Sequence, residues 1–400
     1  MGLRRASRRV ADQPPIYLDH NATTPIHDEV VEAMLPYLRE RFGNPSSGHV
    51  YGRIARAAVD RAREQVAALL ACDPGEIVFT SGGTEASNLA IRGVLEACGS
   101  RRHVVTSAAE HPATAEPCSH LERKGVEVTR VGVNAEGLVL LEELAPFVRS
   151  DTALVTVMLA QNETGTLMPI GEIAKAAHRQ GALVHTDAAQ AVGKIPTRVD
   201  DLGVDLLSVA GHKLYAPKGV GALYVRKGTR IAPLLLGAGH ESGLRAGTEN
   251  VPYVVALGTA CEVARRDLDV NAGRERGLRD RLWARLQAGV PGIRLNGHPR
   301  ERLPNTLNVC FPGVRGCDVL AAAPEIAAST GSACHEGAES PSAVLLAMGI
   351  DAQVAIGAIR LSLGRTTTAG QIDRAGRALV RAFRETRPGR PGEGVSALRH

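Results

Sequence analysis

Short β-branched, apolar runs alternate along the chain with longer stretches rich in Ala, Arg and Glu. The short runs have the length of buried strands, and the longer stretches have helical length and composition. This alternation is typical of βαβ units around a mostly parallel sheet. The predicted strands are 77–80, 104–106, 154–158, 183–185, 206–209, 222–225, 307–310 and 359–362. The predicted helices are 28–41, 53–70, 85–97, 173–180, 251–266, 274–288, 343–348 and 371–383.

A chain of 400 residues is long enough for two domains. The stretch 274–288 reads as an amphipathic helix that leads into a new unit, so we place the domain change near residue 268. The prediction is a large domain over 27–267 and a small domain formed by 16–26 together with 268–383. Residues 1–15 and 384–400 are rich in Arg, Pro and Gly without apolar periodicity, and we expect disordered tails there.

Composition excludes several classes of partner. The net charge is +5, but only 3% of residues are aromatic, so the chain lacks the stacking platform that nucleic-acid binding uses. No run approaches the roughly 20 apolar residues that span a bilayer. The N-terminal arginines are not followed by the apolar stretch of a secretory signal. The seven cysteines are odd in number and widely spaced, which argues against a disulfide framework and favours the cytoplasm.

Lys213 is the first candidate for chemistry. It lies in VDLLSVAGHKLYAPKGVGALYV (204–225), directly after His212, in a loop bounded by Gly and Pro that follows a predicted strand. In open α/β sheets, ligands gather outside the carboxyl ends of the strands, where such a loop lies. Taken alone, Lys213 also fits an ordinary surface lysine.

Asp187 lies at the end of another predicted strand, in ALVHTDAAQAVG, with Gln190 three residues further on. A carboxylate at this edge is placed to pair with a pyridinium nitrogen, and a lysine at the same edge can form a Schiff base. These are the two protein groups that a pyridoxal cofactor demands. Asp187 on its own equally fits a helix N-cap.

A phosphate cradle is predicted in EIVFTSGGTEASNLAI (76–91). A strand ends at Thr80, Gly82 and Gly83 permit a tight turn, and Thr84 opens a helix whose N-terminus offers free N–H groups and a favourable dipole. The segment is not a P-loop, because the Gly-Lys-Ser/Thr ending is missing. Together with Lys213, this pattern favours a pyridoxal-phosphate site.

Cys334 lies in STGSACHEGAESPS (329–342), a stretch of small and polar residues without apolar periodicity. Structural cysteines are usually buried among hydrophobic residues, so a thiol in such a loop suggests a reactive role. His335 could favour the thiolate, which is a minor species at neutral pH for an ordinary thiol. The alternatives are a merely tolerated cysteine and a zinc ligand. No Cys-x-x-Cys pair exists and Cys317 is not at ligand spacing, so we predict no metal site.

These motifs occur with others in one order along the chain. They are YLDHNATTP (17–25), GNPSSGH, FTSGGTEASNLAI, AEHPA, QNETGT, HTDAAQAVGK, GHKLYAPKGVG, RAGTEN, GSAC and IRLSLGRTTT (359–368). With these residues the chain resembles the cysteine desulfurases of the NifS/IscS type, in the class V aminotransferase group of fold-type I pyridoxal-phosphate enzymes. The resemblance implies an α/β fold, with a large domain built on a mostly parallel mixed sheet flanked by helices and a smaller α+β C-terminal domain. It also implies conversion of L-cysteine to L-alanine, with the sulfur passing to Cys334 as a persulfide.

The resemblance further implies roles for single residues. Lys213 would hold the cofactor and move the α-proton, His111 would stack on the pyridine ring and act as acid or base, and Cys334 would accept the sulfur. Arg360 and Asn162 would bind the substrate carboxylate, which suits the planar guanidinium. Judged by residue type alone, Asn162 also fits a turn cap and Arg360 a surface arginine. The implied cofactor-binding residues are Gly83, Thr84, His111, Asn162, Asp187, Gln190, His212, Lys213 and Thr248.

Thr248 would reach the phosphate from a second subunit, which implies a homodimer. The persulfide would serve a sulfur-acceptor protein, in iron–sulfur cluster assembly or another sulfur-transfer pathway. One departure from the family pattern is Ala210, where many members carry a phosphate-binding serine, and Ser208 does not clearly replace it. Selenocysteine lyases also tend to lack that serine, so L-selenocysteine stays an alternative substrate. Transamination, which has no use for Cys334, and an inactive scaffold are the remaining alternatives.

Overall fold

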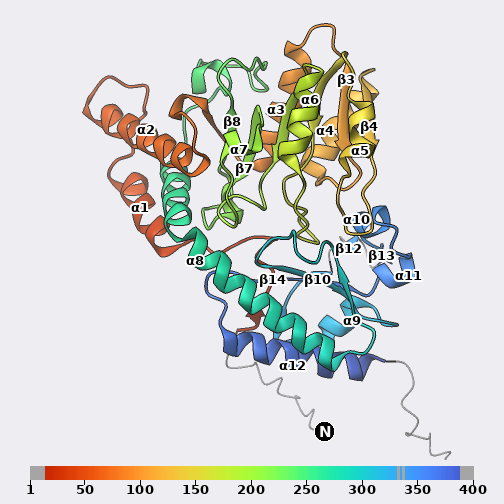
Figure 1. Cartoon of the computed structure of the whole chain (residues 1–400). Coiled ribbons are helices and arrows are strands. Elements are labelled where there is room, and N and C mark those ends of the chain that lie inside the picture. The colour runs from red at the N-terminus through yellow and green to blue at the C-terminus, as the bar shows by residue number, and fades with distance from the viewer. Residues whose placement is uncertain (1–13, 331–333, 336–337, 388–400) are drawn as a thin grey trace, which may run out of the picture.

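The computed structural model describes residues 14–330, 334–335 and 338–387, and of residues 334–335 and 338–339 it describes the backbone alone. Of the tails expected over residues 1–15 and 384–400, residues 1–13 and 388–400 lie outside the described residues. Figure 1 shows a larger part built around one wide sheet and a smaller part below it, with one long helix, α8 (Val251–Gly289), running from the first to the second.

The larger part is built on a seven-stranded sheet. Its strand order is β2-β8-β7-β6-β5-β3-β4, and β8 alone runs antiparallel to its neighbours. The predicted mostly parallel α/β sheet is therefore confirmed. The edge strand β4 was not predicted, because four of its five side chains are exposed or half-buried and the strand shows no apolar run. The strands are β2 (Ile77–Thr80), β3 (His103–Ser107), β4 (Glu127–Val131), β5 (Thr152–Thr156), β6 (Leu183–Asp187), β7 (Leu206–Ala210) and β8 (Gly221–Val225).

Helices cover both faces of this sheet. Successive residues of a strand point to opposite faces, so Leu206 packs under α3 and α4 whereas Leu207 joins the core below α1, α2, α6 and α8. Burial on both faces explains why the strands read as apolar runs rather than alternating patterns. The covering helices are α1 (Asp28–Arg39), α2 (Val50–Leu70), α3 (Gly83–Ala97), α4 (Pro112–Arg123) and α6 (Ile170–Arg179), with the short α5 (Leu141–Leu144) and α7 (Val199–Leu202) at the periphery.

The smaller part contains an antiparallel sheet of order β14-β10-β9, packed against α12 and the second half of α8. The N-terminal residues join it, because Ile16 and Tyr17 pair in parallel with Ile326 and Ala327. Its elements are β1 (Ile16–Tyr17), β9 (Arg294–Asn296), β10 (Thr306–Cys310), α9 (Gly316–Ala321), β11 (Ile326–Ala327), β12 (Cys334–His335), β13 (Ala338–Glu339), α10 (Ala343–Ala347), α11 (Ala352–Ala355), β14 (Ala358–Ser362) and α12 (Ala369–Thr386).

The two helices predicted over 251–266 and 274–288 are one helix, α8, of 39 residues. The intervening residues 267–273 contain Asp, Asn and Gly and lack buried apolar side chains, which made them look like a break. At 1.5 Å per residue the helix is about 58 Å long, so its two halves pack in different cores while its middle is solvated. The domain change predicted near residue 268 therefore falls inside a helix. The last helix also extends to Thr386, past the expected start of the C-terminal tail.

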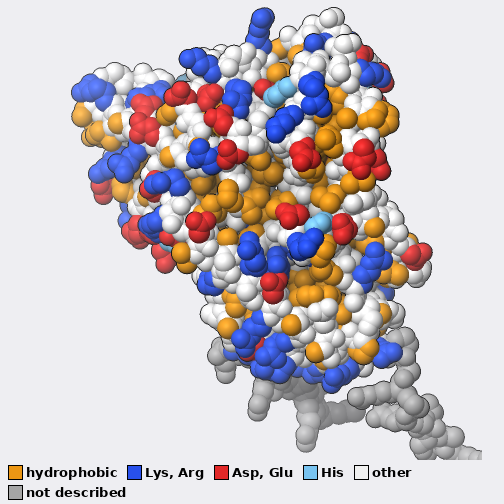
Figure 2. Space-filling model, in the orientation of Figure 1, with side chains coloured by type: hydrophobic (Ala, Val, Ile, Leu, Met, Phe, Trp, Pro, Cys, Tyr) orange, Lys and Arg blue, Asp and Glu red, His pale blue; other side chains and the backbone are white. Residues whose placement is uncertain are grey.

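Arginines gather on the surface of the smaller part, over α12 and the end of α8 (Figure 2). Several of them form ion pairs: Arg281 and Arg285 both bind Asp373, and Arg381 binds Glu325. Much of the positive charge on this surface is thus locally balanced. Among the described residues, no helix combines the length and the apolar character needed to cross a bilayer.

Candidate functional site

The loops that follow β2, β3, β5, β6 and β7 meet at one edge of the large sheet, because these parallel strands all end there. A pocket of about 370 Å³ opens at this edge. Arg360, on β14, reaches it from the smaller part. Of the residues predicted for the site, the pocket is lined by Gly83, Thr84, His111, Asn162, Asp187, Gln190, His212, Lys213 and Arg360. Thr248 does not line it.

Lys213 follows β7 in a single 3₁₀ turn and points into this pocket. Its Nζ donates hydrogen bonds to the carbonyl oxygens of Asn21, at 2.5 Å, and Ala22, at 2.7 Å. Burial lowers the pKa of the Lys213 amine to about 8, helped by the positive charge of Arg360 and opposed by Asp19 and Asp187. Lys213 is therefore no ordinary surface lysine, and its neutral, nucleophilic form is accessible near neutral pH.

Asp187 ends β6 and is only 6% exposed. Its Oδ1 accepts a hydrogen bond from the backbone N–H of Ala189 at 2.9 Å. Burial raises the pKa of the Asp187 carboxyl, and the nearby His111 and Lys213 oppose that rise. Residues 188–198, all of them described, contain turns and isolated bridge residues but no helix, so Asp187 caps no helix there. A buried carboxylate at the pocket floor is suited to a cationic N–H group of a ligand.

His111 stands at the N-cap of α4 and lines the pocket. Its Nδ1 accepts a hydrogen bond from the N–H of Ala113 at 3.1 Å, so the neutral ring carries its proton on Nε2. Desolvation lowers the pKa of His111. The helix α4 was not predicted, because Pro112 and Pro117 interrupt its sequence. Proline is nevertheless well tolerated at the first position of a helix, which Pro112 occupies.

The N-terminus of α3 faces the pocket through Gly83 and Thr84. No side chain caps this helix, so its first N–H groups remain available for an anion. The turn can pack closely on β8 because Gly221 has no side chain: a Cβ there would lie 2.7 Å from the Cα of Gly82. His212 lines the same pocket, and burial lowers its pKa to about 4, so its imidazole is neutral at physiological pH.

The structure settles the question about Ser208. Its side chain is fully buried and does not line the pocket. Ser208 Oγ accepts a hydrogen bond from Ser87 Oγ at 3.1 Å and lies 2.9 Å from His185 Nε2. Ser208 therefore does not line the pocket beside Ala210, whereas Thr84, at the N-terminus of α3, does.

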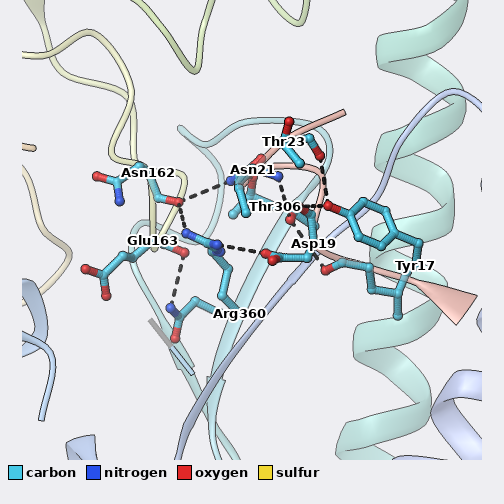
Figure 3. Close-up of polar contacts among 12 residues, drawn as sticks. Tyr17, Asp19, Asn21, Thr23, Asn162, Glu163, Thr306 and Arg360 are labelled. Atoms are coloured by element: carbon cyan, nitrogen blue, oxygen red, sulfur yellow. Dashed lines mark hydrogen bonds and ion pairs between the residues drawn. The ribbon is translucent and has the colours of Figure 1, made fainter. Parts of the chain in front are cut away.

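Arg360 is buried, with 7% exposure, so it is not a surface arginine. Figure 3 shows its guanidinium between Asp19 and the turn that carries Asn162. Arg360 Nη2 binds Asp19 Oδ1 at 2.8 Å, and Nη1 donates to the backbone oxygen of Asn162 at 3.3 Å. The Nε atom is buried and has no partner among the described atoms. A guanidinium with donors left over at a pocket wall suits a substrate carboxylate.

The side chain of Cys334 lies outside what the structure describes, but both ends of its loop are placed. On one side, Arg360 N donates to Ser329 O at 2.7 Å. On the other, Ser342 Oγ donates to Glu163 Oε2 at 2.6 Å, and Glu163 directly follows Asn162. The segment that carries Cys334 is thus attached at both ends to residues adjoining the pocket.

Comparisons with known proteins show the family to which the chain belongs. The model of the aminotransferase class-V family matches residues 16–375. The chain belongs to this family. A "Cysteine desulfurase" of Trichormus azollae is 50% identical over 361 residues, 90% of each chain. The human "Cysteine desulfurase" is 44% identical over 363 residues, covering 90% of this chain and 79% of the relative. A solved "NIFS-LIKE PROTEIN" matches with a TM-score of 0.87 and 38% identity, over 93% of this chain and all of the other.

A second solved structure, "SspA in complex with cysteine", matches with a TM-score of 0.77 and 35% identity, over 87% of this chain and 98% of the other. Class-V aminotransferases depend on pyridoxal 5'-phosphate. The residues of this pocket fit that cofactor: an uncapped helix N-terminus suits the phosphate, the buried Asp187 suits the ring nitrogen, and the Lys213 amine suits the aldehyde.

Some residues of this class-V site were missed in the sequence. Asn21 and Ala22 belong to the YLDHNATTP motif, yet they meet Lys213 through backbone oxygens, which leave no side-chain signature. Lys194 is a buried lysine, 8% exposed, whose Nζ donates to Gln190 Oε1 at 2.8 Å. Burial lowers the pKa of Lys194 to about 7, and the positive charge of Lys213 adds to that effect. Lys194 is the last residue of the HTDAAQAVGK motif, and the sequence alone indicated no role for it.

Proposed function

We propose that this class-V protein is a pyridoxal-phosphate-dependent cysteine desulfurase, which converts L-cysteine to L-alanine and takes the sulfur as a persulfide on Cys334. The observation that carries the proposal is the convergence of the Lys213 amine, the buried Asp187 and the Arg360 guanidinium on one pocket. Relatives of 44–50% identity named cysteine desulfurase support it, as does the structural neighbour SspA, which was solved in complex with cysteine.

Each side chain then has a task. Arg360 and the side chain of Asn162 hold the substrate carboxylate, which places the α-carbon above the pocket floor. Lys213 would hold the cofactor through its amine and, as the free amine, would take the α-proton. His111 would lie against the ring, and Asp187 would bind the ring nitrogen. Bound pyridoxal phosphate supplies an electron sink for the electrons of the α-carbon. The phosphate is held by Gly83, Thr84 and His212, and Gln190 binds the ring hydroxyl.

Sulfur leaves through Cys334. Its thiolate attacks the sulfur of the bound cysteine, an S–S bond forms, and the C–S bond breaks with its electron pair remaining on the substrate. Protonation of that carbon skeleton gives alanine. A thiolate is the nucleophile in such exchange, so the step requires a reduced thiol. This requirement supports the cytoplasm as the compartment of the reaction.

The Cys334→Ala variant tests this proposal. We expect alanine formation from L-cysteine to fall by roughly 100-fold or more, because the sulfur loses its acceptor. The absorbance of the lysine-bound cofactor should remain, since Lys213 and Asp187 are untouched. Alanine is measured by amino-acid analysis, and the Cys317→Ala variant serves as a thiol control. Normal turnover in the Cys334→Ala variant would contradict the proposal.

The proposal includes a homodimer. Thr248 is exposed and lies outside the pocket of its own chain, as expected if it serves a second subunit. The chain also carries exposed apolar side chains: Phe42 is 71% exposed and stacks on the half-exposed Tyr51, while Leu236 is 87% exposed. Ser46 Oγ lies 3.4 Å from His240 Nε2, so the segment with Phe42 and the segment with Leu236 are in contact. Exposed apolar side chains in neighbouring segments favour burial against another chain.

Mixing two variants tests the shared site. Thr248→Ala alone should weaken cofactor binding about 10- to 100-fold, the value of one hydrogen bond to a charged group. Lys213→Ala alone should be inactive. In a mixed dimer, one site combines Lys213 of one chain with Thr248 of the other and should regain wild-type affinity and turnover. Cofactor titration and alanine formation measure this after co-refolding the two chains. A mixture with no more activity than the two separate variants would contradict the crossover.

The sulfur acceptor is proposed to be a protein carrier, in iron–sulfur cluster assembly or another sulfur-transfer pathway. No observation on the pocket or among the relatives named above favours a selenocysteine lyase. Parallel assays with L-cysteine and L-selenocysteine measure the substrate preference directly, and we expect efficient alanine formation from L-cysteine.

A further inference from the structure

Asn21 stands at the centre of the polar contacts in Figure 3, although its side chain has no task in the proposed reaction. The residue lies in the loop after β1 and is only 1% exposed. Its backbone oxygen accepts from Lys213 Nζ at 2.5 Å and from Gln190 Nε2 at 2.9 Å. Two neighbours proposed to bind the cofactor thus share one carbonyl group.

The side chain of Asn21 fixes that carbonyl. Its Nδ2 donates to Asn162 O at 3.2 Å and to Thr306 Oγ1 at 2.9 Å. Its Oδ1 accepts from Asn305 Nδ2 at 3.1 Å. The backbone N–H donates to Ser362 Oγ at 2.9 Å. The loop residue is therefore attached to β10, to β14 and to the turn that carries Asn162.

Asn162 O completes the link. It accepts from Asn21 Nδ2 and also from Arg360 Nη1. One short chain of hydrogen bonds therefore runs from the Lys213 amine through Asn21 and the Asn162 carbonyl to the Arg360 guanidinium. In an amino acid the α-carbon and the carboxylate are one bond apart. The group that takes the α-proton and the group that binds the carboxylate must consequently be held in fixed register.

We propose that Asn21 is the positioning residue that sets this register, with its carbonyl and that of Ala22 holding the Lys213 amine whenever it is free of the cofactor. Both N–H groups of a neutral amine then point at the two carbonyls, and its lone pair is directed away from them. The inference rests on the proposed function for its catalytic meaning, whereas the contact between Lys213 and Asn21 stands on geometry alone.

The Asn21→Asp variant tests the link selectively. Asp keeps the acceptor that receives Asn305 Nδ2 but replaces the Nδ2 donor by an oxygen. Thr306 Oγ1 already donates its proton to Asn305 Oδ1, and Asn162 O has none, so both former acceptors would face another acceptor. Since a misplacement of about 1 Å can cost about 100-fold in rate, we expect kcat to fall 10- to 100-fold.

A matched control is Asn308→Asp. Asn308 is also fully buried, its Nδ2 donates to the carbonyl of the adjoining turn residue Glu163 at 3.1 Å, and its Oδ1 accepts from Asn296 Nδ2 at 2.8 Å. The same substitution therefore breaks the same kind of contact without reaching Lys213. Both variants should lose similar thermal stability, which separates general damage from positioning.

Two readouts distinguish the variants. With L-cysteine deuterated at the α-carbon, the isotope effect on kcat should rise above the wild-type value in Asn21→Asp alone, because proton transfer to Lys213 becomes slower. In the full-length chain stripped of cofactor, labelling with acetic anhydride across pH reports the titration of Lys213. That titration should move to higher pH in Asn21→Asp, since a carboxylate joins Asp19 and Asp187 in opposing Arg360.

An isotope effect and a Lys213 titration that match wild type in both variants would overturn the inference. Failure of the wild-type protein to form alanine would instead overturn the proposed function. In that case the labelling of Lys213 still tests its contact with Asn21, which stands on geometry alone.

Discussion

Replacing Lys213 by alanine is expected to reduce alanine formation from L-cysteine by roughly 1,000-fold or more, within the range that loss of a positioned acid–base group produces. The variant should also lose the visible absorbance that arises from the covalent link between lysine and cofactor. Lys194, the other lysine nearby, cannot replace Lys213, because its amine donates a hydrogen bond to Gln190 and it does not line the pocket. Absorbance spectra and alanine assays on the purified variant measure both effects.

The control for this prediction is Lys218→Ala. Lys218 is an exposed lysine of the same loop, outside the pocket lining, so the variant should keep both the absorbance and the activity. Free methylamine offers a second check, because an added amine can restore part of the proton transfer in Lys213→Ala. Substantial activity of Lys213→Ala without added amine would show that another group moves the α-proton.

The sequence identified the parts of the site whose chemistry depends on side chains at strand ends. Lys213 and Asp187 were found because each follows an apolar run, and the parallel sheet brings such positions to one edge. Their alternative interpretations, a surface lysine and a helix N-cap, disappear once burial and the turn after β6 are seen. Arg360 is a weaker case: its strand was predicted, but only the structure shows that it enters the pocket from the smaller part.

The sequence could not show contacts made by backbone atoms, or contacts between residues far apart along the chain. Asn21 meets Lys213 with a carbonyl oxygen, which any residue carries, so residue type gave no hint. The long helix α8 was read as two helices because local propensity around Gly273 is poor, whereas packing at both ends decides its continuity. The helix α4 was missed for the related reason that Pro112 is favourable only once the helix is known to start there.

Asp187→Asn is the second variant with a large expected effect. An amide of the same shape keeps the contact with the N–H of Ala189 but carries no negative charge toward the ring nitrogen. Loss of one partner of a buried charge pair costs about 3–5 kcal/mol, so cofactor affinity and kcat/KM together should fall by roughly 100- to 5,000-fold. Without the negative charge of Asp187 the ring nitrogen holds its proton less firmly, and an unprotonated ring is the weaker electron sink.

Asp205→Asn separates this electrostatic role from scaffold damage. Asp205 is as buried as Asp187, at 7% exposure, but it precedes β7 and therefore lies at the opposite edge of the sheet. Its Oδ2 accepts from Val184 N and lies 2.8 Å from His178 Nε2. We expect this variant to lose thermal stability while it keeps cofactor affinity and turnover. Equal losses of turnover in the two variants would mean that Asp187 supports the sheet rather than the cofactor, and the assignment of the ring nitrogen to Asp187 would then be wrong.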